Sequence, residues 1–115
     1  MNSLGSQMTV HEKIDKWLDD RGITENGKVM GQAIKTLEET TELLDAINHN
    51  NTDEIMDAVG DIYVTLRGVC KVRKLSFDKC VEGAYNEIKD RRGYLSSGGT
   101  FVKETKSEER IPSRN

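Results

Sequence analysis

The sequence predicts an all-α protein, a bundle of about four helices that assembles into an oligomer. A single proline occurs in 115 residues, which argues against a turn-rich β fold. Between residues 9 and 93, polar and apolar side chains alternate at helical spacing. The strongest packing pattern lies in residues 53–73, where apolar residues recur at spacings of 4, 3, 4 and 3: Ile55, Val59, Ile62, Leu66 and Val69.

The first predicted helix begins after Thr9. Thr9 and Glu12 have the spacing of a capping box, in which each side chain binds the backbone amide of the other residue. This helix is expected to end near Gly22, and the turn-forming residues 23–27 predict a loop. Residues 1–8 are small and polar, and we expect them to form a flexible leader.

Two long helices are predicted next, over residues 29–48 and 53–73. Thr52 is a candidate N-cap for the second of them, and the acids after it suit the helix dipole. The first has one broad apolar side, and a different side carries Gln32, Lys35, Glu39, Glu42 and Ala46. The second is apolar on several faces, so we expect it to be the central helix of the bundle.

A fourth helix is predicted from Ser76, its candidate cap, to about Arg92, with Gly93 as the residue that ends it. Residues 9–93 would then form the helical domain. Residues 94–115 are expected to form a C-terminal extension, extended at first and then disordered.

The composition restricts the function. The chain is 35% hydrophobic and 32% charged, so its own core is thin, and burial in a homodimer or homotetramer is expected. A net charge of −3 argues against a nucleic-acid partner. No apolar run is long enough to span a membrane, and the N-terminus carries no export signal. We therefore expect no membrane partner and a cytoplasmic location.

Two acidic clusters lie on the two long helices. The first contains Glu39 and Glu42, and the second contains Asp57 and Asp61. If the helices pack antiparallel, the four carboxylates converge, and their mutual repulsion favours binding of a hard divalent cation such as Mg²⁺. The alternative is that both acidic faces are simply solvated.

The motifs around these acids resemble a known family. Lys35-x-x-Glu38-Glu39-x-x-Glu42 followed by Asp57-x-x-Gly60-Asp61 is similar to the MazG-like all-α nucleoside triphosphate pyrophosphohydrolases. Residues 84–93 and 99–104 look like the short MazG-like proteins of phages. The resemblance implies metal-dependent cleavage of a (deoxy)nucleoside triphosphate to its monophosphate and pyrophosphate. The cofactor would be Mg²⁺, with Mn²⁺ as a substitute, and a phage-encoded chain would act in the host cytoplasm.

The same resemblance implies a metal site, with one departure from the family pattern. Glu39 and Glu42 match the first acidic pair of the family, and Asp61 matches its last acid. Three residues before that last acid the family usually has Glu, where this chain has Ala58. Asp57 or Glu54 must replace the missing carboxylate, and we favour Asp57.

Further roles follow from position. Glu38 or Glu39 is expected to orient the attacking water, and Lys35 to bind a phosphate unless it only forms a salt bridge with Glu39. Gln32 shares this side of the helix and is a predicted substrate contact. The family signature near the end of the domain implies three more contacts, unless they are only a basic helix end: Asn86, Lys89 and Arg92. Two other functions remain open, a phosphoribosyl-ATP pyrophosphohydrolase-like activity and a non-enzymatic interaction module.

Overall fold

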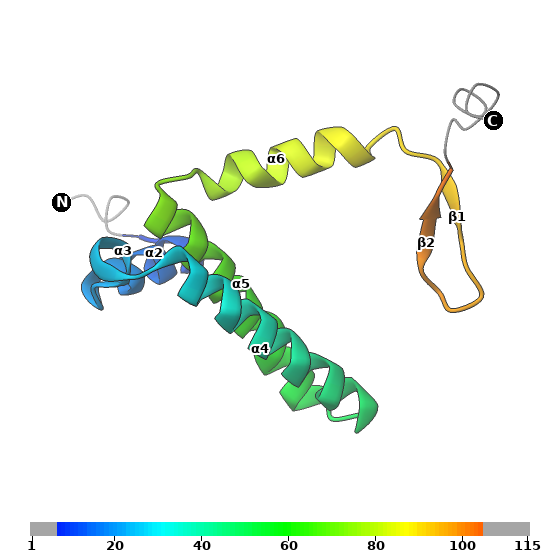
Figure 1. Ribbon diagram of the computed structural model, residues 1–115, viewed down its shortest axis with the longest axis horizontal. Helices are drawn as coiled ribbons and strands as arrows, with labels where there is room; N and C mark the ends of the chain where they lie inside the picture. The colour runs from blue at the N-terminus through cyan, green and yellow to red at the C-terminus, as the bar shows by residue number, and fades with distance from the viewer. Residues whose placement is uncertain (1–6, 105–115) are drawn as a thin grey trace. The chain divides into compact units, whose positions relative to one another are not determined.

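The structure, a computed structural model, describes residues 7–104. Five helices precede two short strands in this part of the chain (Figure 1), which confirms the all-α prediction. The chain divides into two compact units between Phe77 and Asp78, and the residues of the predicted helical domain belong to both units. Most of the predicted leader and the predicted disordered tail lie outside the described residues.

The first helix, α2 (Val10–Asp20), begins as predicted. The amide of Glu12 donates to the Thr9 hydroxyl at 3.1 Å, and the amide of Thr9 donates to the Glu12 carboxylate at 2.9 Å. The capping box is therefore formed in full. Leu18, which is 1% exposed, anchors α2 in the core of the first unit.

The predicted loop over residues 23–27 is wrong in part, because a short helix, α3 (Ile23–Asn26), forms there. Gly22 reverses the chain with a φ of 79°, a conformation that costs glycine little. The amide of Asn26 then donates to the carbonyl of Gly22, and the amide of Gly27 to that of Ile23. One turn of helix is closed by these two bonds.

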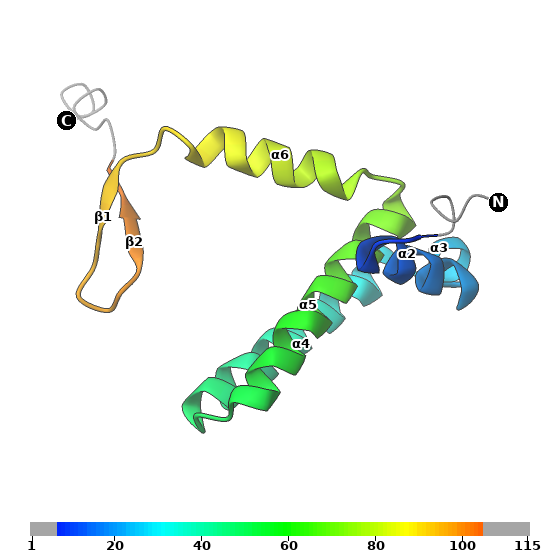
Figure 2. The ribbon, with the colours of Figure 1, turned by 180° about the vertical axis from the view of Figure 1, so that it is seen from behind.

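The two long helices form an antiparallel pair, α4 (Val29–Asn48) and α5 (Thr52–Arg73), with bounds within one residue of those predicted. They lie side by side in both views (Figures 1 and 2). Their partners run in opposite order along the two helices, since Gln32 lies against Gly68 and the Thr36 hydroxyl lies 2.8 Å from that of Thr65. This pairing brings Asp61 of α5 close to Glu39 of α4.

Small residues allow this close approach. The buried positions of the pair are Ala46, Ala58, Thr65, Gly68 and Cys70. A Cβ at Gly68 would lie 2.3 Å from the amide oxygen of Gln32, so glycine makes room for that side chain. Asn51 caps α5 with its side chain, and the predicted cap Thr52 is instead the first helical residue.

The second unit holds most of α6 (Phe77–Ile88) and a hairpin of β1 (Gly93–Leu95) and β2 (Phe101–Lys103). The prediction that this helix reaches Arg92 is wrong, because the backbone of that region pairs with β2. The amide of Glu104 donates to the carbonyl of Arg92, and a Cβ at Gly93 would lie 2.1 Å from the Val102 carbonyl oxygen. Gly93 thus permits a close strand contact. No helix within residues 7–104 has the length and apolar character that spanning a membrane requires.

Candidate functional site

Carboxylates from both long helices meet at the middle of the α4–α5 pair. The apolar run of residues 62–66, directly after Asp61, predicts that this acid is partly buried. This prediction is wrong, because Glu42 and Asp61 are exposed and Glu39 is the half-buried acid. Burial raises the pKa of Glu39 above its ordinary value, and the charges of Glu42 and Asp61 raise this pKa further. Three of the four carboxylates predicted to converge, Glu39, Glu42 and Asp61, therefore lie close enough to interact, whereas Asp57 is not among the groups that shift the pKa of Glu39.

One carboxylate oxygen of this cluster is buried without a hydrogen-bond donor among residues 7–104. The Oε1 atom of Glu39 is buried and has no hydrogen-bond partner among the described residues. A buried carboxylate oxygen without a donor is costly, and a cation beside it would remove that cost. Within residues 7–104, no group of three or more His, Cys, Asp or Glu side chains is arranged so that it could hold a metal ion. The carboxylate oxygens are donors of the kind that a hard cation prefers.

Asp57 lies on the side of α5 that faces α2. It lines a cavity of about 540 Å³ together with Asp61, and the walls of this cavity come from α2 and α5. Glu54 does not line it. The backbone amide of Glu54 receives the Asn51 cap, and its carboxylate lies close enough to His49 to raise the pKa of that histidine, after the larger effect of Asp45.

Lys35 pairs with Glu38 at 3.2 Å, and not with Glu39 as the salt-bridge alternative expected. Both side chains are more than half exposed. The hydrogen bond with Glu38 raises the pKa of Lys35, and the charges of Glu39 and Glu42 add to this effect. Gln32 lies two turns before Glu39, against Gly68. The Lys35 ammonium group is therefore close enough to the acidic cluster to interact with its charges.

The three predicted contacts near the end of the domain belong to the second unit. Asn86 is on α6, and Lys89 and Arg92 follow it in the turn that leads to β1; all three are exposed. Their role as substrate contacts stays a prediction from the sequence.

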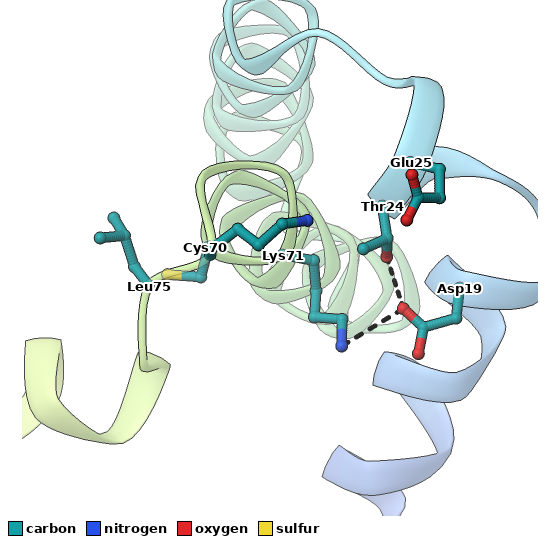
Figure 3. Close-up of a pocket in the computed structure, with 7 residues that line it drawn as sticks. Asp19, Thr24, Glu25, Cys70, Lys71 and Leu75 are labelled. Carbon is teal, nitrogen blue, oxygen red and sulfur yellow. Dashed lines mark hydrogen bonds and ion pairs between the residues drawn. The ribbon is translucent and has the colours of Figure 1, made fainter.

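A second cavity of about 440 Å³ lies in the first unit, between α2, α3 and the end of α5 (Figure 3). Asp19 accepts hydrogen bonds there from the Thr24 hydroxyl at 2.5 Å and from Lys71 at 3.2 Å. These bonds lower the pKa of Asp19, that of Thr24 most strongly. None of the predicted site residues lines this cavity.

A polar network next to the Asp57 cavity was not predicted from the sequence. The Arg67 guanidinium donates two bonds to Asp15, at 2.8 and 2.6 Å, and a third to the Tyr63 hydroxyl at 2.9 Å. The same hydroxyl is hydrogen-bonded to Nδ1 of His11. Asp15 and Arg67 are 52 positions apart, and no local spacing could have paired them.

Taken together, the fold and the facing carboxylates define a class of helical proteins with an acidic site between paired helices. The MazG nucleotide pyrophosphohydrolase domain family matches residues 32–95, more than half of the chain. The chain belongs to this family, which confirms the resemblance inferred from its motifs.

One similar protein is an uncharacterized 18.2 kDa protein from the rep-hol intergenic region of Haemophilus phage HP1. It is 34% identical to this chain over 55 residues, which cover 48% of this chain. The match spans only 34% of the phage protein, about a third of its length. No solved structure matches the chain significantly.

Replacing Glu39 with Gln is expected to raise the melting temperature of the metal-free protein by a few degrees at neutral pH. The raised pKa of Glu39 means that its ionisation opposes folding. This penalty is absent below the ordinary value of 4.5 and develops as the pH rises through the folded pKa. Thermal melts of both proteins with a chelator, from pH 4 to 8, should show a difference that disappears at the acid end.

Glu38→Gln is the matched control, because Glu38 is exposed and already paired with Lys35. It should not raise the melting temperature at any pH. If the Glu39→Gln protein has a lower melting temperature than the wild type at neutral pH, the claim that ionisation of Glu39 opposes folding is wrong.

Proposed function

We propose that this protein is a metal-dependent nucleoside triphosphate pyrophosphohydrolase, which cleaves (deoxy)nucleoside triphosphates to monophosphates and pyrophosphate. The observation that carries the proposal is the half-buried Glu39, whose partnerless oxygen lies beside two further carboxylates in a chain of the MazG family. A solvated acidic face has no reason to bury such an oxygen. Its substrates are cytoplasmic metabolites, and we expect the protein to act in that compartment.

In this proposal each residue has a distinct task. Glu39, Glu42, Asp57 and Asp61 would bind Mg²⁺, or Mn²⁺ in its place, through carboxylate oxygens. The bound ion would neutralise the triphosphate and polarise the bond that breaks. Glu38 or Glu39 would accept a hydrogen bond from the water that attacks the α-phosphorus.

The substrate contacts are the basic and amide residues. Lys35, which is exposed near the acidic cluster, would attract the phosphates. Gln32, which lies one turn before Lys35 on α4, would be a further substrate contact. From the family resemblance, Lys89 and Arg92 would bind the leaving pyrophosphate, and Asn86 the sugar or a water.

The test is a screen of the common ribo- and deoxyribonucleoside triphosphates for Mg²⁺-dependent pyrophosphate release. Phosphorus NMR at an early time point should show a monophosphate and pyrophosphate, with no free phosphate. A nucleoside diphosphate product would contradict cleavage between the α- and β-phosphates. No release, together with no stabilisation of the fold by Mg²⁺, would identify an interaction module instead.

We expect Asp57, and not Glu54, to complete the metal site. Asp57 lines the same cavity as Asp61, whereas Glu54 sits in the first turn of α5, where its charge complements the helix dipole. Asp57→Asn should raise the Mg²⁺ concentration needed for half-maximal activity about tenfold or more, and Glu54→Gln should leave it within about twofold. Mg²⁺ titrations of both variants decide the question, and the reverse order would show that Glu54 is the ligand.

We also propose that a second copy of the chain covers the α4–α5 pair, as part of a homodimer or homotetramer. Large apolar side chains of these helices are more than half exposed, among them Leu37, Leu44, Ile47 and Val59. The heptad spacing on α5 suits packing against another helix, and few of the large side chains in residues 7–104 are buried. Light scattering of the purified protein checks this, and a monomer would contradict it.

A further inference from the structure

The cavity beside Asp57 and Asp61 is lined by side chains of two chemical kinds. Asp57 and Asp61 of α5 are carboxylates, whereas Val10 and Ile14 of α2 and Met56 and Val64 of α5 form an apolar lining, here called the apolar wall. Its volume of about 540 Å³ is within the range of small-molecule sites in proteins. An apolar wall next to proposed metal ligands suits a ligand with a charged part and a flat, uncharged part.

His11 and Tyr63 are polar side chains on the wall of this cavity. Their rings meet edge to face with centroids 5.3 Å apart, and Tyr63 stacks in the same way on Phe77. Arg67 lies over the Phe77 ring at 4.8 Å and is held by Asp15. The tyrosine is thus fixed from three sides, and it in turn fixes the imidazole.

The network also favours one tautomer of the neutral His11 imidazole. A guanidinium can only donate, so the Tyr63 oxygen accepts from Arg67. The Tyr63 hydroxyl has one hydrogen, and within residues 7–104 the one acceptor bonded to this hydroxyl is Nδ1 of His11, so the arrangement that uses every donor directs that hydrogen to Nδ1. The neutral imidazole therefore carries its hydrogen on Nε2. Within residues 7–104, the structure gives Nε2 no hydrogen-bond partner.

We propose that His11 is a specificity-determining residue that donates its Nε2 hydrogen to a carbonyl oxygen or ring nitrogen of the nucleobase of the substrate. Tyr63 and Arg67 are positioning residues, which act through the tautomer and orientation of His11. This proposal rests on the proposed function, because the triphosphate is placed at the carboxylates and the base on the apolar wall. A phosphate is a poor match for that wall, since a buried charge there would lack a counter-charge.

The experiment compares His11→Phe, His11→Gln and Tyr63→Phe with the wild type over the full set of nucleoside triphosphates. His11→Phe keeps an aromatic ring and removes the donor, so KM for the preferred nucleotide should rise about tenfold, with kcat changed by less than about threefold. The preference among bases should fall by a similar factor. His11→Gln keeps a donor near the Nε2 position and should retain most of the preference. Tyr63→Phe should lie between the two.

His49→Phe is the matched control, because His49 is the other histidine and bonds to Asp45 at the far end of α4. It should change neither KM nor the preference. If His11→Phe keeps the wild-type preference while the wild type is active, the inference is wrong and the proposed function stands.

A second readout does not depend on turnover. Nitrogen NMR of the imidazole should show hydrogen on Nε2 in the wild type and a mixture of tautomers in Tyr63→Phe. Nucleoside monophosphates, added without metal, should shift the His11 signals but not those of His49. If neither histidine responds, the inference is overturned, even if the wild type releases no pyrophosphate and the proposed function has itself failed.

Discussion

Replacing Asp61 with Asn is expected to reduce pyrophosphate release by more than about a hundredfold and to leave the metal-free fold at least as stable. Loss of an outer partner of a metal ligand typically costs 10- to 100-fold, so a direct carboxylate ligand should cost more. In the absence of metal, the Asp61 charge opposes ionisation of Glu39, and asparagine removes that charge. Steady-state rates and thermal melts with a chelator measure the two effects separately.

Asp53→Asn provides the control on the same helix. Asp53 is an exposed acid in the first turn of α5, away from Glu39, and its replacement should change activity by less than about twofold. Near wild-type activity of the Asp61→Asn protein would show that the acidic cluster is not the catalytic site.

The second large effect is on stability. Arg67→Met is expected to lower the free energy of unfolding by about 2–3 kcal/mol, because it leaves the Asp15 carboxylate without its two charged hydrogen bonds. The Arg67 side chain is 12% exposed and that of Asp15 is 27% exposed, so water replaces these bonds poorly. Hydrogen bonds to Asp15 also raise the pKa of Arg67 above its ordinary value. Urea unfolding measures the loss.

Lys16→Met is the control, because it removes an ion pair that is exposed to solvent. Lys16 and Asp20 are 2.7 Å apart, but both side chains are more than half exposed, so the loss should stay below about 0.5 kcal/mol. In a double-mutant cycle, Arg67→Met combined with Asp15→Asn should cost less than the sum of the single changes. Equal losses for Arg67→Met and Lys16→Met, or full additivity in the cycle, would contradict the role assigned to this pair.

The sequence by itself determined the local features. The capping box of Thr9 and Glu12, the bounds of α4 and α5, and the family of the chain all follow from short spacings. The convergence of Glu39, Glu42 and Asp61 was also predictable, because helical periodicity places each acidic cluster on one face and antiparallel pairing brings the faces together.

Only the tertiary structure decided which carboxylate of the cluster is buried. Glu39 is half-buried and Asp61 is exposed, whereas the apolar run after Asp61 had predicted partial burial of Asp61. The end of α6 was likewise set by pairing of the chain near Gly93 with residues ten positions further on. The bonds from Arg67 to Asp15 and Tyr63 orient His11, and they join α2 to α5 across 52 positions. Such contacts depend on how distant elements pack, and the spacing of neighbouring residues carries no information about them.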